Sequence, residues 1–180
     1  NVTSIENATG GRLVADNSQV KPKPRVVQPP VNINPMAVLT MSVMAPAGGN
    51  FFGEDLVRAF KRAKFEYGEM GIFHLFDGVN DTSSLVCSAA NALNPGTFDL
   101  AEISSFSTVG VSLFLSLPTN GNNLRAFEKM LSAAQQLGRD LGGELKDDHR
   151  SDLTAQTIEH YRQRIRDFEL DQLRVAGGRG

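Results

Sequence analysis

Residues 110–117 read Gly-Val-Ser-Leu-Phe-Leu-Ser-Leu, and this stretch decides the fold. In an extended strand, successive side chains point to opposite faces of the sheet. The odd-numbered positions are all large and apolar, whereas positions 112, 114 and 116 are serine, phenylalanine and serine. The pattern predicts a strand that turns one face to a core, and it places a lone aromatic ring, Phe114, on the other face.

Comparable patterns extend in both directions from this strand. Strands are predicted over 37–44, 69–76 and 84–92, with shorter ones at 103–107 and 144–147. Amphipathic helices are predicted over 54–64, from an Asn122 cap to Gly142-Gly143, and after a Thr154 cap. Short loops between strands favour antiparallel pairing, and helices that are apolar on one side favour stacking on one face. The predicted fold class is α+β, an antiparallel sheet of split β-α-β type with its other face open.

The two ends of the chain differ from this folded part. Residues 1–35 hold five of the eight prolines and no aromatic residue, which predicts a flexible Pro-rich linker. Residues 36–173 form the predicted domain, and the Gly-rich residues 174–180 are expected to be a disordered tail. The chain begins with Asn1 rather than Met, so we expect a fragment of a longer protein, itself soluble, with any targeting segment upstream.

The sequence offers little catalytic chemistry. The three histidines, at 74, 149 and 160, have no metal-ligand spacing to one another or to a cysteine, and no Gly-rich phosphate loop occurs. His74, at a strand end, is expected to be solvated or to act as a cap. The single cysteine, Cys87, lies in an apolar run and is expected to be a small buried hydrophobe. We therefore predict no enzyme activity, no catalytic residue, no metal site and no cofactor.

The open face of the predicted sheet is the informative feature. Its expected members are small or apolar and carry no charge at the centre: Val38, Thr40, Met70, Ile72, Ala90, Ala92, Ser112 and Phe114. Contiguous apolar surface of this kind often marks an interaction site. Small side chains around one aromatic ring make a shallow groove, which suits a peptide held by a few hydrophobic anchors. The alternative is that the N-terminal tail or a displaced helix covers this face.

Three segments resemble a known family: residues 65–74 (FEYGEMGIFH), 94–99 (NPGTFD) and 110–114 (GVSLF). Over residues 36 to about 170 the chain is similar to the C-terminal domain of the ZipA family, bacterial cell-division proteins that bind FtsZ. The resemblance implies a six-stranded sheet backed by three helices on one face. It also implies that the C-terminal tail peptide of FtsZ binds across the uncovered face.

The resemblance also implies contact positions and a location. Carried over residue by residue, the contacts fall on the eight open-face positions above and on Arg150. Thr40, Ala92 and Ser112 stand where the family can carry isoleucine, methionine and threonine, which implies a shallower groove. The implied role is a non-enzymatic adaptor that tethers FtsZ polymers to the cytoplasmic face of the inner membrane at the division septum. Its membrane contact would be made only through an N-terminal segment outside this chain.

Two other functions stay open at this point. Some split β-α-β domains stack single-stranded RNA on sheet aromatics. Here the face carries one aromatic ring and the net charge is −2, whereas nucleic-acid binding favours a basic surface. We therefore expect no nucleic-acid partner. A small-molecule enzyme would need a deep polar pocket, and the sequence predicts none.

Overall fold

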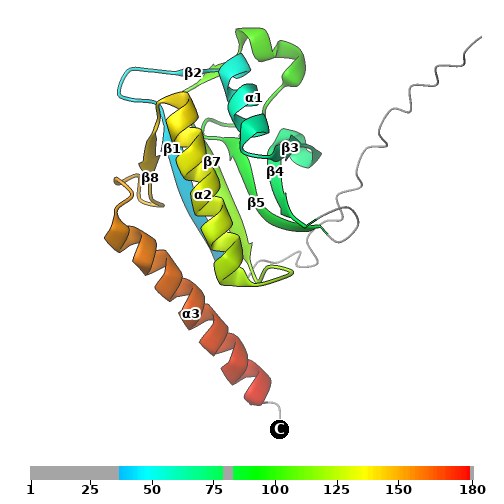
Figure 1. Ribbon diagram of the computed structural model, residues 1–180, viewed down its shortest axis with the longest axis vertical. Helices are drawn as coiled ribbons and strands as arrows, with labels where there is room; N and C mark the ends of the chain where they lie inside the picture. Colours follow the sequence, from blue (N-terminus) through cyan, green and yellow to red (C-terminus); the bar gives the residue numbers. More distant parts are fainter. Residues whose placement is uncertain (1–36, 79–82, 179–180) are drawn as a thin grey trace, which may run out of the picture.

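The computed structural model describes residues 37–78 and 83–178, and they form an antiparallel sheet with helices (Figure 1). The main sheet has six strands in the order β3-β4-β5-β7-β1-β8. Its strands are β1 (Ala37–Met44), β3 (Phe65–Tyr67), β4 (Phe73–Asp77), β5 (Ser84–Asn91), β7 (Gly110–Leu117) and β8 (Glu144–Lys146). Strands β2 (Phe51–Phe52) and β6 (Ser107–Thr108) form a separate two-stranded ribbon. The predicted α+β class with an antiparallel six-stranded sheet is confirmed.

The helices begin and end where the sequence places their signals. Helix α1 (Gly53–Arg62) has acidic residues in its first turn and basic residues in its last, as the helix dipole favours. Helix α2 (Asn123–Leu141) begins at Asn122, whose side chain accepts a hydrogen bond from the backbone N–H of Arg125. It ends at Gly142, which adopts the left-handed conformation with φ +63°. Helix α3 (Ala155–Gly177) begins at Thr154, whose hydroxyl accepts from the N–H of Thr157.

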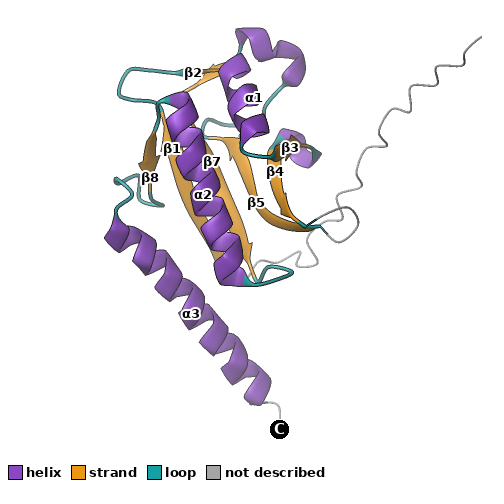
Figure 2. Ribbon diagram, in the orientation of Figure 1, coloured by secondary structure: helices purple, strands orange, loops and turns teal. Residues whose placement is uncertain are grey.

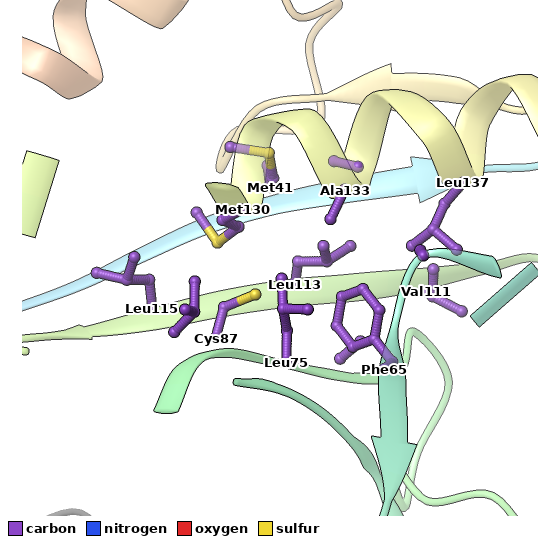
Figure 3. Close-up of a cluster of buried hydrophobic side chains, with 14 of the residues drawn as sticks. Met41, Phe65, Leu75, Cys87, Val111, Leu113, Leu115, Met130, Ala133 and Leu137 are labelled. Atoms are coloured by element: carbon purple, nitrogen blue, oxygen red, sulfur yellow. The ribbon is translucent and has the colours of Figure 1, made fainter. Parts of the chain in front are cut away.

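The core lies between the sheet and α2 (Figure 3). The odd-numbered residues of β1 and β7 point toward the helix and are at most 1% exposed from Leu39 to Val43 and from Val111 to Leu117. Met130, Ala133 and Leu137 of α2 pack above them. Cys87 of β5 is 2% exposed within this core, and burial raises the pKa of its thiol. The expectation that Cys87 is a buried hydrophobe is confirmed.

Helix α3 lies beside the sheet edge rather than over the sheet's centre (Figures 1 and 2). Its buried residues Tyr161 and Ile165 are both in its N-terminal half. The hydroxyl of Tyr161 donates a hydrogen bond of 2.6 Å to the backbone oxygen of Thr40. Strand β8 pairs with β1 only at residues 42–44, so Tyr161 satisfies a carbonyl of β1 just beyond the reach of β8.

Three local predictions were wrong, the first two because short 3₁₀ turns interrupt a weak strand period. The strand expected over 69–76 is interrupted: residues Glu69–Gly71 form the 3₁₀ helix η1, and β4 starts only at Phe73. The strand expected at 103–107 is largely the 3₁₀ helix η3 (Leu100–Ser105). Residues 174–177, expected in a disordered tail, continue α3. The predicted linker, residues 1–35, and the last two residues lie outside the described residues.

Candidate functional site

The even-numbered side chains of the central strands form the sheet face opposite α2, here called the open face. Strand registers place these side chains in rows that cross the sheet. Phe114 of β7 lies opposite Thr40 of β1 on one side and opposite Ser88 of β5 on the other, and Ser88 in turn lies opposite His74 of β4. Directly opposed side chains in antiparallel strands are in contact range. Phe114, half-buried, is therefore flanked on both sides by small hydroxyl-bearing residues.

The next row across the sheet consists mainly of small side chains. It runs Ala90, Ser112 and Ser42 across three strands, and ends on Lys146 of β8. The hydroxyl oxygens of Ser42 and Ser112 lie 3.2 Å apart, so each supplies the other's hydrogen-bond partner. This row therefore has no large side chain at its centre beside the Phe114 ring.

Large apolar groups and one cation lie at the ends of β1. Val38 is 41% exposed at one end of the strand. At the other end, the side chain of Met44 lies over Gly110, where an added Cβ would stand only 2.4 Å from the Met44 sulfur. The guanidinium of Arg150, in the turn after β8, donates to that sulfur at 3.7 Å. Arg150 therefore lies at the rim of the open face next to Met44.

The β4 side differs from what the strand pattern predicted. Met70 lies in η1, not on a strand, and is 72% exposed with φ +62°. Ile72 is 5% exposed and is not part of the main core cluster. These two residues therefore do not form a flat continuation of the face. Met70 instead projects from a turn, and Ile72 is a buried residue at the base of that turn.

Charges lie at the β8 edge. Lys146 is hydrogen-bonded to Asp152 and to Glu144, and these bonds raise the pKa of the lysine. Asp147 is 7% exposed, and its Oδ1 accepts hydrogen bonds of 2.9 Å from the backbone N–H groups of His149 and Ser151. These bonds shape the turn that carries Arg150. Asp147 therefore has a structural role in this turn.

Six of the nine predicted contact positions lie on or directly beside the open face of the strands. Val38, Thr40, Ala90, Ser112 and Phe114 are within strands, and Ala92 follows β5 with its N–H bonded to Gly110 O. Met70, Ile72 and Arg150 lie in turns at its two sides. The predicted contact set did not include Ser42, Met44, Ser88 or His74. The same alternation, extended along β1 and β5, could have found the first three.

A second hollow, elsewhere on the described part of the chain, has different chemistry. This hollow, between α1 and the end of α2, is lined by charged residues such as Arg58, Arg62 and Asp140. The Arg62–Asp140 ion pair there is 3.7 Å long, and Arg62 is 69% exposed. In residues 37–78 and 83–178, no group of three or more His, Cys, Asp or Glu side chains could hold a metal ion. Within the same ranges, no helix has the length and apolar character needed to cross a membrane.

Comparison with known proteins decides the family. Residues 37–164 match the family described as "ZipA, C-terminal FtsZ-binding domain".

The chain belongs to the ZipA C-terminal domain family.

Curated ZipA relatives agree with this assignment. The chain is 42% identical over 163 residues to the cell division protein ZipA of Stutzerimonas stutzeri, covering 91% of this chain and 58% of that protein. It is 49% identical over 136 residues to ZipA of Ectopseudomonas mendocina, covering 76% and 50%. It is 47% identical over 153 residues to ZipA of Marinobacter nauticus, covering 83% and 45%. The chain thus spans about half the length of these relatives, and the predicted family resemblance is confirmed.

Proposed function

We propose that this chain is a cell-division adaptor domain that binds the C-terminal tail peptide of FtsZ on the open face. The contact residues would be Val38, Thr40, Met70, Ile72, Ala90, Ala92, Ser112, Phe114 and Arg150. The observation that supports this most directly is the half-buried Phe114 ring between small side chains, on a sheet face opposite α2, in a family described as FtsZ-binding.

The shape of the face favours a peptide over a small polar substrate. Ser88, Ser112 and Thr40 leave shallow space around Phe114, and a peptide can fill it with two or three apolar side chains. Met70 is 72% exposed and would lose much of that exposure under a bound chain. Ile72 would contribute as part of the turn that carries Met70. Arg150 would provide a cation at the rim.

This surface supports a non-enzymatic role. The proposed adaptor would link FtsZ polymers to the cytoplasmic face of the inner membrane at the septum, with residues 1–35 as part of a flexible linker. A peptide that orders on docking loses conformational entropy, so each contact would be of modest affinity. Many tethered domains on one polymer would raise the effective concentration and compensate for weak single contacts.

Substitution of the central aromatic residue tests this proposal. We expect Phe114→Ala to weaken binding of an FtsZ C-terminal peptide by about 2 kcal/mol or more, because a central aromatic anchor is lost. Isothermal titration of the variant with the peptide measures this. Phe52→Ala is the matched control, since Phe52 is 63% exposed on the separate β2–β6 ribbon. Unchanged affinity in Phe114→Ala would remove Phe114 as the anchor.

The RNA-stacking alternative has less support. Its platform would need several exposed rings on adjacent strands, whereas the direct neighbours of Phe114 in its row are Thr40 and Ser88.

A further inference from the structure

His74 is buried on a face whose other members are small or partly exposed. The side chain is 3% exposed, although strand register places it in the row of Ser88 and Phe114. What covers it is the chain just before β4. A Cβ added at Gly68 would stand 3.4 Å from the His74 ring, and the backbone oxygen of Glu69 lies 3.1 Å from Nε2.

Both ring nitrogens of His74 have partners, and the partners determine the tautomer. The oxygen of Glu69 is a carbonyl that can only accept, so Nε2 must carry the proton and donate to it. In a neutral ring, Nδ1 then has a free lone pair, and the hydroxyl of Ser88 donates to it at 2.7 Å. The ring is thus fixed at one end to β5 and at the other end to the backbone of η1.

The turn that His74 contacts is strained at Met70. A non-glycine residue with positive φ is strained and persists only where surrounding contacts enforce it. Met70 has φ +62°, and Gly71 follows with φ +66°. On its far side the turn is bonded by the N–H of Phe98, which donates to Gly71 O at 2.8 Å. On the sheet side, His74 Nε2 is hydrogen-bonded to the backbone oxygen of Glu69, the residue just before the strained Met70.

We propose that His74 is a positioning residue for partner binding: it holds the Glu69–Gly71 turn against the open face so that Met70 is already in place when a peptide arrives. This inference rests on the proposed function. For this role the side chain at position 74 must present one N–H donor at the Nε2 position. This donor holds the Glu69 carbonyl in place, because breaking a buried hydrogen bond leaves both its donor and its acceptor unsatisfied. Preorganisation of this kind strengthens binding by lowering the ordering cost.

Two substitutions at one position separate positioning from general stability. In His74→Gln the amide nitrogen is as many bonds from Cα as Nε2 and can still donate to Glu69. In His74→Asn the amide ends near the Nδ1 position and can reach only Ser88. Both remove the ring, so we expect similar losses of thermal midpoint. We expect His74→Asn to weaken FtsZ-peptide binding about five- to ten-fold and His74→Gln to stay within about two-fold of the wild type.

The conformation of the Glu69–Gly71 turn is also measured in the variants without peptide. In His74→Asn, the Met70 methyl resonance should move toward its random-coil position and the amides of residues 69–71 should lose exchange protection. Ile158→Ala, half-buried on α3, is the destabilised control and should change neither. In the wild type, imidazole ¹⁵N shifts should show the Nε2–H tautomer. Because this measurement uses only the wild type, it does not depend on whether any variant folds.

Several outcomes would overturn the inference. These are equal peptide affinities for His74→Asn and His74→Gln, an unchanged Met70 methyl in His74→Asn, or an Nδ1–H tautomer in the wild type. Failure of the wild type to bind the peptide would instead contradict the proposed function, and the methyl and tautomer measurements would still decide whether His74 holds the turn.

Discussion

At the scale of single residues, Met70 combines backbone strain with exposure. It has φ +62° and is 72% exposed, so in the free chain its side chain contributes little to folding. Asn tolerates the left-handed conformation far better than Met. We expect Met70→Asn to leave the free energy of unfolding unchanged or raise it by up to about 1 kcal/mol. We expect the same change to weaken peptide binding by about 1–2 kcal/mol, because the apolar contact is lost.

Urea unfolding and calorimetric titration on one preparation measure both effects. Leu173→Asn is a suitable control, because Leu173 is 68% exposed on α3, away from the open face. If Met70→Asn destabilised the fold and left binding intact, Met70 would be structural and not a contact.

Single residues also show what the sequence could reveal. Alternation placed Phe114 correctly, because β7 is eight residues long and its period is unbroken. It misplaced Met70 and Ile72, because a three-residue 3₁₀ helix precedes β4 and interrupts the period. The burial of His74 depends on a backbone carbonyl five positions earlier folding back over the ring, and no local pattern encodes that contact.

At the scale of elements, Tyr161 joins α3 to β1. Its hydroxyl donates to Thr40 O at 2.6 Å and accepts from the N–H of Asp148 at 3.1 Å. We expect Tyr161→Phe to lower the free energy of unfolding by about 1–3 kcal/mol, because two part-buried hydrogen bonds to backbone groups are lost. Urea unfolding followed by circular dichroism measures the difference, and a loss near zero would contradict the role of this hydroxyl.

The same hydroxyl predicts a pH dependence. Burial raises the pKa of Tyr161 from about 10 to about 12. The unfolded chain therefore loses this proton near pH 10, while the folded chain keeps it until about pH 12. The stabilisation is complete below pH 10 and is lost as the pH rises to 12. The stability difference between wild type and Tyr161→Phe should therefore shrink between pH 10 and pH 12, and a constant difference would contradict this assignment.

The sequence predicts long elements well and short ones poorly. Helices α1, α2 and α3 have an amphipathic pattern over several turns, and the capping residues Asn122 and Thr154 fix the starts of α2 and α3. Strands β2 and β6 have two residues each and β3 has three, which is too short for a period to appear. These elements form through pairing with distant segments, such as Phe51 with Thr108.

At the scale of the whole molecule, the layers explain why no described helix covers one face of the sheet. Helices α1 and α2 lie on one side of the sheet, and α3 lies beyond its β1–β8 side (Figure 2). A face with small residues at its centre would be a poor core, and it suits a partner that provides the missing apolar groups. The sequence indicated this division because most helix-facing positions of β1 and β7 are large, whereas the opposite positions at the centre of the sheet are small apart from Phe114.

The most direct test of the central claim is an amide-shift titration of the ¹⁵N-labelled chain with the C-terminal peptide of FtsZ. We predict saturable shifts at residues 38–44, 88–92 and 110–116 and in the turn at 69–72, with the exposed surfaces of α1 and α2 unchanged. Shifts centred on the charged hollow between α1 and α2, or none at millimolar peptide, would contradict the assignment of the open face as the FtsZ-binding surface.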